Sequence, residues 1–338
     1  MIIIDGSEGE GGGQIVRNAC ALSLVSGEPF QISNIRGKRA KHGLMRQHLT
    51  AVEAACVISG SECSGLAVGS SDLHFRPGRV EPGEYHFAVG TAGSTSLVLQ
   101  TVLMPLLLAS GPSRLILEGG THNMAAPPFD FVERSFLPVI NRMGPRVSGR
   151  IIRHGFYPRG GGRIEIDIDP APLAPIDCAS RGELLGTSAQ VVLAGLPMEI
   201  AERMLARTKH LLPEWSQDAF TVREIPDDEG PGIILMLEAR YAQVSEIVSG
   251  FGQFGVPAER LAKTSAARIA GYIEATAFAG PYLADQLILP FVLAGGGSYT
   301  TVKPSQHLLT AIDIARRFTG RRIELQQQVG GAHLLAVG

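Results

Sequence analysis

A histidine near the end of the chain occupies a position suited to phosphate chemistry. In the stretch KPSQHLL, His307 follows Ser305, and serine is a favoured helix N-cap residue. Apolar residues then recur on one helical face, at Leu308, Ile312 and Ala315. The first turn of a helix has unpaired N–H groups and the positive end of the dipole, which disfavour imidazolium and attract phosphate. His307 is therefore a candidate nucleophile toward phosphorus, and a histidine that merely caps or packs is the alternative interpretation.

Basic residues gather in one short stretch, although the net charge of the whole chain is only −2. No acidic residue occurs between Pro29 and Val52, and this stretch holds Arg36, Lys38, Arg39, Lys41, His42, Arg46 and His48. A short basic patch on a nearly neutral protein suits one phosphate-bearing end of a substrate better than a long nucleic-acid backbone. A solvated surface loop is the competing interpretation.

The elements that must position these residues follow a repeated design. Three segments, residues 9–33, 90–120 and 279–302, each combine a small-residue turn, an apolar helix, a glycine break and a strand. The glycines predicted to end the helices are Gly27, Gly111 and Gly295, so the first two are 84 residues apart (111 − 27) and the last two 184 (295 − 111). A repeat of roughly 80 residues explains the first spacing, and the excess indicates an inserted domain or a fourth, degenerate unit.

The insertion is assigned to residues 182–275, which are richer in charge and hold the only tryptophan, Trp215. Their pattern predicts a helix, two strands and a second helix. We therefore expect an α/β (α+β) fold class, with a core domain built from residues 1–181 and 276–338 and a small α/β domain between them.

Composition places the chain among ordinary globular proteins, with 338 residues, 45% hydrophobic and 18% charged. No apolar run is long enough to span a bilayer, and the glycine-rich, acidic start does not read as a signal peptide. The four cysteines show no CxxC spacing and are expected to be reduced. A cytoplasmic protein with no membrane partner is therefore expected.

Six motifs in order make the interpretation specific, although neither GxGxxG with its acidic partner nor GxxxxGK[ST] is present. They are DGSEGEGGGQIVR (5–17), IRGKRAKHGLMRQHLTAV (35–52), GTAGSTSLVLQT (90–101), HGFYPRGGGRI (154–164), YLADQLILP (282–290) and PSQHLLT (304–310). Along its whole length the chain resembles the RNA 3′-terminal phosphate cyclase family. The resemblance implies a core of repeated βαβαββ units with a smaller inserted α/β domain.

The resemblance also implies a reaction. A histidine attacks the α-phosphate of ATP, pyrophosphate leaves, and AMP passes from the histidine to an RNA 3′-phosphate. The adjacent 2′-hydroxyl then closes a 2′,3′-cyclic phosphate and releases AMP. Matching the motif makes His307 the nucleophile, although this chain has Gln306 where the family often has cysteine.

The resemblance also implies which residues bind ATP and its metal ion. Glu10, in a turn whose glycines allow close approach to phosphate, is expected to bind ATP through a divalent metal, Mg²⁺ or Mn²⁺. Its alternative role is that of an acid satisfying a helix dipole. The other residues expected at ATP are Gln100, Pro127, Tyr282, Leu283, Ala284, Asp285 and Gln286, with adenine between Tyr282 and Pro127. Tyr282 as a core residue is the competing interpretation.

The RNA 3′-phosphate end is the second expected partner. The residues that match positions meeting it are Arg17, Arg36, Arg39, Gln47 and His48. The fork of an arginine suits a terminal phosphate dianion, and a histidine can exchange a proton with a 2′-hydroxyl.

Three other functions compete with this one. Non-catalytic relatives that act as ribosome-assembly scaffolds share the fold but lack the histidine. An enolpyruvyl transferase would need a second basic cluster, which the sequence does not contain. A broader enzyme that adenylylates other phosphate ends, such as 5′-phosphates, fits the same residues.

Overall fold

The computed structural model describes all 338 residues. The first unit alternates strands and helices and ends in two antiparallel strands: β1 (Ile2–Asp5), α1 (Gln14–Ser26), β2 (Phe30–Ser33), α2 (Arg46–Val57), β3 (Glu62–Ser64) and β4 (Leu73–Arg76). Its sheet has the strand order β1-β2-β4-β3, with β1 and β2 parallel and the other neighbours antiparallel.

The second unit repeats this pattern with an extended second helix. Its elements are β5 (Glu84–Ala88), α3 (Thr95–Leu107), β6 (Ser113–Gly119), α4 (Phe129–Phe131), the π-helix η1 (Val132–Phe136), α5 (Leu137–Arg142), β7 (Arg146–Arg153) and β8 (Gly162–Asp169). The strand order β5-β6-β8-β7 is the order of the first sheet, and again only the first pair is parallel.

The third unit is interrupted after its first strand. It consists of β9 (Asp177–Cys178), then α8 (Pro281–Ala294), β14 (Gly297–Thr301), α9 (Gln306–Thr319), β15 (Ile323–Gln327) and β16 (His333–Val337). Read from β9, the order β9-β14-β16-β15 matches the other two sheets. The βαβαββ repeat and the α/β fold class are therefore confirmed, and the strand that opens the third unit lies before the insertion.

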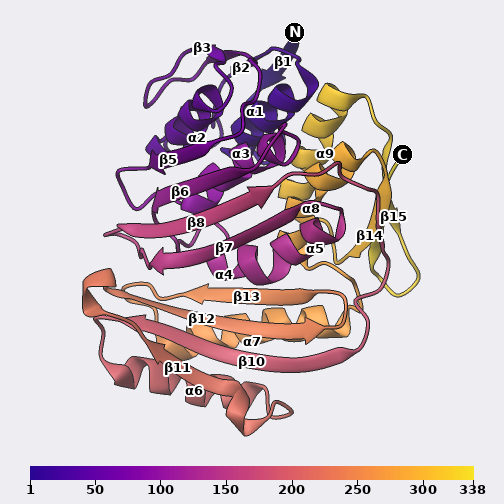
Figure 1. The fold of residues 1–338 in the computed structure, drawn as a ribbon. Coiled ribbons are helices and arrows are strands. Elements are labelled where there is room, and N and C mark those ends of the chain that lie inside the picture. The colour runs from indigo at the N-terminus through magenta and orange to yellow at the C-terminus, as the bar shows by residue number, and fades with distance from the viewer.

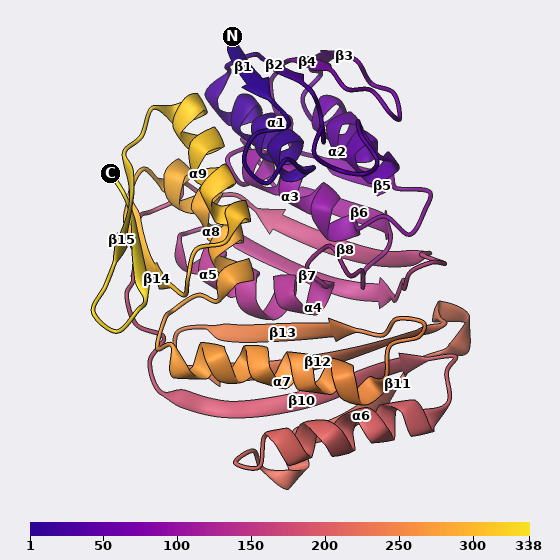
Figure 2. The same cartoon turned by 180° about the vertical axis from the view of Figure 1, so that it is seen from behind.

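The interruption contains a fourth sheet with its own helices. Its elements are β10 (Leu184–Ala194), α6 (Met198–Leu211), the 3₁₀ turn η2 (Gln217–Ala219), β11 (Phe220–Glu224), the 3₁₀ turn η3 (Asp227–Glu229), β12 (Gly232–Tyr241), β13 (Ser245–Phe251) and α7 (Ala258–Glu274). Its order, β11-β10-β12-β13, places the first strand inside the sheet, so it is no fourth copy of the repeat. Figures 1 and 2 show it beside the core, with α6 and α7 on one face.

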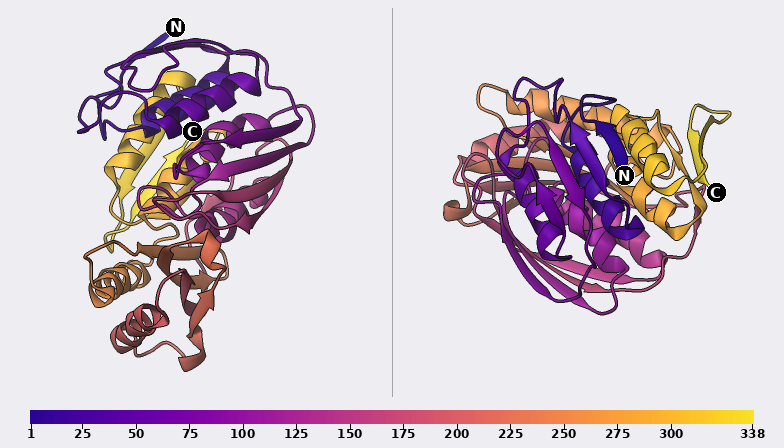
Figure 3. Two further views of the ribbon diagram at one scale, coloured as in Figure 1. Left: turned by 90° about the vertical axis from the view of Figure 1, so that its left-hand side faces the viewer. Right: turned by 90° about the horizontal axis from the view of Figure 1, so that it is seen from above.

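Alternate residues of the inserted strands pack on opposite faces of their sheet, which explains how this sheet joins the core. On β12, Ile233, Leu235 and Leu237 belong to a hydrophobic cluster with α6 and α7. The residues between them, Ile234 and Met236, belong to the main core cluster. Successive side chains of a strand point to opposite faces, so the inserted sheet is buried on both. It therefore forms a distinct lobe that still packs on the core (Figure 3).

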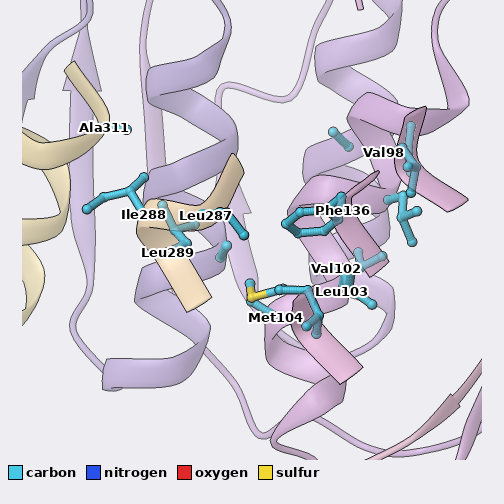
Figure 4. Close-up of a cluster of buried hydrophobic side chains, with 14 of the residues drawn as sticks. Val98, Val102, Leu103, Met104, Phe136, Leu287, Ile288, Leu289 and Ala311 are labelled. Atoms are coloured by element: carbon cyan, nitrogen blue, oxygen red, sulfur yellow. The ribbon is translucent and has the colours of Figure 1, made fainter. Parts of the chain in front are cut away.

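Two core helices, α3 and α8, are buried because they are apolar on nearly every face. Every residue of α3 is buried except Gln100, and α3 packs against α1 and α2 while α9 packs against α1 and α8. Figure 4 shows side chains of α3, η1 and α8 gathered in this interior. None of the helices is long and apolar enough to cross a membrane.

Two of the three predicted helix-ending glycines cap their helices. Gly27 and Gly295 adopt left-handed backbone, with φ of 75° and 80°, a region that glycine enters without steric cost. The prediction for Gly111 is wrong, because α3 already ends at Leu107. After Pro105 the chain tightens into three-residue turns, in which Leu108 N–H donates to the Pro105 carbonyl at 3.2 Å.

Candidate active site

His307 lies in the first turn of α9 with one ring nitrogen held. Ser305 caps the helix by accepting a hydrogen bond from Leu308 N–H at 2.9 Å. The Nδ1 atom of His307 lies 3.0 Å from Oε1 of Gln14, at the start of α1. An amide oxygen only accepts, so Nδ1 carries the proton in this pairing, and Nε2 has the free lone pair. The imidazole side chain is 48% exposed, which leaves it accessible to a substrate.

Burial and two arginines together disfavour protonation of this imidazole. Burial, with the positive charges of Arg17 and Arg39, lowers the pKa of His307 below its ordinary value of 6.5. Arg17 is itself buried, and burial lowers its pKa to about 10, so it remains charged at neutral pH. The site therefore combines a neutral nitrogen nucleophile with fixed positive charge, which is the combination that phosphate chemistry needs.

Glu10 faces the histidine from the glycine-rich turn between β1 and α1. Its Oε1 lies 3.9 Å from Nε2 of His307 and forms an ion pair with Arg39. Its backbone N–H donates to Thr310 Oγ1 of α9 at 3.0 Å, which ties the turn to the helix that carries His307. No group of three His, Cys, Asp or Glu side chains is placed to hold a metal ion alone.

A chain of polar contacts crosses the helices behind the histidine. Nε of Arg17 donates to Oε1 of Gln100 at 3.3 Å, and the Gln100 amide donates to Gln286 of α8. The one residue of α3 that escapes full burial thus joins α1 to α8. The structure brings Arg17, Gln100 and Gln286 together as a connected group beside His307.

The α8 residues predicted to meet ATP divide between surface and interior. Tyr282 is 45% exposed, whereas Leu283 and Ala284 are fully buried in the core. Asp285 is also buried, and its carboxylate accepts a hydrogen bond from the Ser305 hydroxyl at 2.6 Å. Burial raises the pKa of Asp285 to about 7. Asp285 thus lies behind the cap of α9. Leu283, Ala284 and Asp285 were all predicted to contact the nucleotide, and their burial does not favour such contacts.

Pro127 is half-buried in the loop that follows β6. This loop leads into η1, which packs against α8. The proline and Tyr282 therefore belong to neighbouring segments, and their sandwich around adenine stays a prediction.

Several predicted RNA-binding residues are engaged in hydrogen bonds with the backbone of loops and helix ends. The Arg36 guanidinium donates to the carbonyl of Lys41 at 2.7 Å, and Gln47 accepts from Ser94 N–H at 3.2 Å. His48 is buried and accepts from Met45 N–H at 3.1 Å. Burial, with the charges of Arg17 and Arg36, lowers the pKa of His48 to about 3, which makes it a poor proton acceptor at neutral pH.

Comparison with known proteins identifies the family of this chain. Residues 8–325 match the family model described as RNA 3'-terminal phosphate cyclase. The chain belongs to the RNA 3′-terminal phosphate cyclase family. A protein of Koribacter versatilis (strain Ellin345) named RNA 3'-terminal phosphate cyclase is 48% identical, over 97% of this chain and 92% of the relative. Relatives of the same name from Ralstonia nicotianae and Ectopseudomonas mendocina are 45% and 44% identical, over 97% of this chain and 94% and 95% of theirs.

Two contacts of this cyclase-family site involve residues to which the sequence analysis assigned no role. Gln14 orients His307, and Thr310 binds the turn that carries Glu10. Each partner is about 300 residues distant along the chain. The only available signal was their presence inside the family motifs DGSEGEGGGQIVR and PSQHLLT.

Two cavities of this family member lie away from His307. One of about 590 Å³ lies between the C-terminal ends of α1, α8 and α9, and one of about 920 Å³ lies between β6, β7 and β8. Neither is lined by a predicted site residue.

Proposed function

We propose that this protein converts an RNA 3′-terminal phosphate to a 2′,3′-cyclic phosphate at the expense of ATP. The observation that carries the proposal is the orientation of His307, whose Nδ1 is held by Gln14 while Nε2 remains accessible at a helix N-terminus. Membership of the cyclase family, and the names of the relatives, support the same reaction.

In the first step, Nε2 of His307 attacks the α-phosphorus of ATP. A P–N bond forms, the bond to the β-phosphate breaks, and pyrophosphate leaves. Gln14 keeps the proton on Nδ1, so the attacking nitrogen is unprotonated. Arg17 and Arg39, whose charges already act on the imidazole, would stabilise negative charge gathering on the phosphate oxygens.

In the second step, an oxygen of the RNA 3′-phosphate attacks the same phosphorus, the P–N bond breaks, and His307 is released. The 2′-hydroxyl oxygen then attacks the 3′-phosphorus, a proton is released, and AMP leaves from the cyclic phosphate. Arg39, which is partly exposed, is suited to bind the incoming phosphate. Arg36 and His48 are engaged within their own segments, so we assign them to shaping the loop.

Tyr282 would stack on adenine, with Gln100 and Gln286 bonding the nucleotide. A divalent cation, Mg²⁺ or Mn²⁺, would bind Glu10, where it would neutralise phosphate charge. One carboxylate fits such an ion, because Mg²⁺ takes few protein ligands and completes its shell with phosphate oxygens and water. The ion would replace Arg39 as the partner of the Glu10 carboxylate.

The test is to incubate the protein with ATP radiolabelled at the α-phosphate and a divalent cation. We expect a label on the protein that is lost in acid and stable in base, and that passes to a 3′-phosphate RNA. His307→Ala and His307→Asn should abolish it, because neither side chain has a nucleophilic lone pair in that position. Normal labelling of either variant would overturn the assignment. Equal transfer to 5′-phosphate RNA would favour the broader adenylylating enzyme.

A further inference from the structure

The turn between β7 and β8 carries the HGFYPRGGG stretch, to which the proposed reaction assigns no role. Gly155 N–H donates to Thr121 Oγ1 at 2.9 Å, and Gly160 N–H donates to the Phe156 carbonyl at 2.6 Å. The Phe156 ring stacks on His122, with 5.2 Å between ring centres. The contacts of Gly155 and Phe156 anchor the start of the turn on the segment after β6, and the bond between Gly160 and Phe156 closes the turn on itself.

The tip presents an aromatic ring and a cation to solvent. Tyr157 is 68% exposed. Arg159 is exposed and donates from Nη1 to the Gly230 carbonyl at 3.3 Å, while its remaining N–H groups are unpaired. Among the large exposed side chains, only Tyr157, Phe254 and Tyr282 are aromatic. Single exposed apolar residues are common on protein surfaces, so exposure alone does not make Tyr157 a binding residue. Its position relative to the candidate active site is the stronger argument.

That position is connected to the candidate active site by direct contacts. The turn lies against the 90–94 loop, because a side-chain carbon at Gly160 would come within 2.8 Å of Ala92 Cα. At the other end of this loop, Ser94 N–H donates to Gln47 at the start of α2. The neighbouring exposed Arg46 donates from Nε to the Val89 carbonyl at 3.4 Å, just before the loop.

From α2 the path continues to the nucleophile. The His48 ring occupies the space that a side chain at Gly13 would need, so the two are in contact. The next residue, Gln14, holds the imidazole of His307. A chain of contacts thus links His307 to the turn by way of α1, α2 and the 90–94 loop, and the exposed Arg46 and Arg159 add positive charge along it.

We propose that Tyr157 and Arg159 bind the nucleotides that precede the 3′ end of the RNA substrate. The inference rests on the proposed function, in which Arg39 binds the terminal phosphate of the RNA. Single-stranded RNA is held by aromatic rings that stack on its bases and by cations that follow its backbone. Tyr157 supplies the ring, Arg159 supplies the cation, and the anchored turn needs no ordering on binding.

The test measures RNA affinity by calorimetry without ATP, so that it does not depend on catalysis. The ligands are a 3′-phosphate RNA of about ten nucleotides, long enough to cover one single-strand binding surface, and a dinucleotide 3′-phosphate. Tyr157→Ala should weaken binding of the longer RNA about 5- to 150-fold and leave the dinucleotide unaffected. Tyr157→Phe should bind both as the wild type does. Phe254→Ala, which removes an exposed aromatic ring from the inserted lobe, is the matched control and should change neither.

Wild-type affinity of Tyr157→Ala for the longer RNA would overturn the proposal, and so would an equal loss for both ligands. Wild-type protein that binds the two RNAs equally tightly would overturn it as well. The labelling assay tests the reaction separately. If RNA binding depends on Tyr157 but no labelled intermediate forms, only the proposed function is refuted. Thermal melting checks that the variants are folded, as expected for a side chain so exposed.

Discussion

The pKa of His307 reflects how its neighbours prepare it for chemistry. It is lowered by burial and by the charges of Arg17 and Arg39. Only the neutral imidazole can attack phosphorus, so formation of the enzyme–AMP adduct should fall as pH decreases through this lowered pKa. Removing Arg39 deletes one of these positive charges, which favours the imidazolium ion and raises its pKa.

Arg39→Ala should therefore move the acid limb of the adenylylation profile to higher pH, whereas Arg39→Lys should leave it close to that of the wild type. The measurement is the rate of protein labelling from ATP between about pH 5 and 8, the range in which histidine titrates. An acid limb that stays in place in the alanine variant would show that Arg39 has no electrostatic influence on the nucleophile.

A separate prediction concerns Tyr282. Its side chain is 45% exposed, whereas the next three residues of the helix are buried. If the ring stacks on adenine, Tyr282→Ala should raise the KM for ATP about 5- to 150-fold, since a stacked base is worth roughly 1–3 kcal/mol. Tyr282→Phe keeps the ring and should be nearly silent. A sharp loss of melting temperature in the alanine variant, with ATP use intact, would instead make Tyr282 a packing residue.

At the scale of elements, a carboxyl group of the inserted sheet meets the start of α8. Glu246 of β13 is fully buried, and it accepts a hydrogen bond from Gly280 N–H at 3.1 Å. Gly280 is the N-cap of α8, two residues before Tyr282. The inserted sheet thus touches the helix that carries the predicted nucleotide-binding residues.

Burial raises the pKa of Glu246 from 4.5 to about 8, so the folded state favours the protonated acid. The stability that this preference contributes is complete below about pH 4.5 and is lost as pH rises through 8. Glu246→Gln keeps an acceptor for Gly280 and cannot ionise. Its melting temperature should therefore exceed that of the wild type at pH 8 to 9, by the equivalent of a few kcal/mol at most.

This advantage of Glu246→Gln should shrink as pH falls toward 4.5. The exposed Glu214→Gln is the matched control and should show no such trend. An equal difference between Glu246→Gln and wild type at every pH would contradict the ionisation argument. Thermal melts across the pH range decide it.

For the whole molecule, the two ends of the insertion meet at one hydroxyl group of the core. Thr300 of β14 donates from Oγ1 to the Ala179 carbonyl at 3.0 Å, where the chain leaves the core. The same oxygen accepts from Phe278 N–H at 2.9 Å, where the chain returns. A lobe of more than ninety residues can therefore be inserted in a repeat unit without separating its first strand from the others.

Thr300→Val removes both hydrogen bonds while keeping the shape of the side chain. We expect a loss of about 1–3 kcal/mol in the free energy of unfolding, because two backbone groups lose their partner. Thr300→Ser keeps the hydroxyl and should lose much less. Chemical denaturation measures both, and identical stabilities of the two variants would show that the hydroxyl does not hold the junction.

The sequence by itself determined the features of this protein that depend on interactions between residues close together in the chain. The cap formed by Ser305, the left-handed glycines Gly27 and Gly295 and the all-round apolar helices depend on contacts within a few residues. The repeat spacing and the resemblance added the βαβαββ architecture and the family. Two features escaped prediction: α3 ends at Leu107 and not at Gly111, and the two-residue strand β9 has too few residues to show a pattern.

Only the tertiary structure decided which side chains face the nucleophile. Gln14 and His307 are 293 residues apart, and Glu10 and Thr310 are 300 apart, so no periodicity can connect them. Adjacent residues of α8 also separated, because successive helical positions are 100° apart: Tyr282 reached the surface while Leu283 turned into the core. Periodicity reports which face of a helix is apolar, whereas the partner of a polar side chain depends on how distant segments pack.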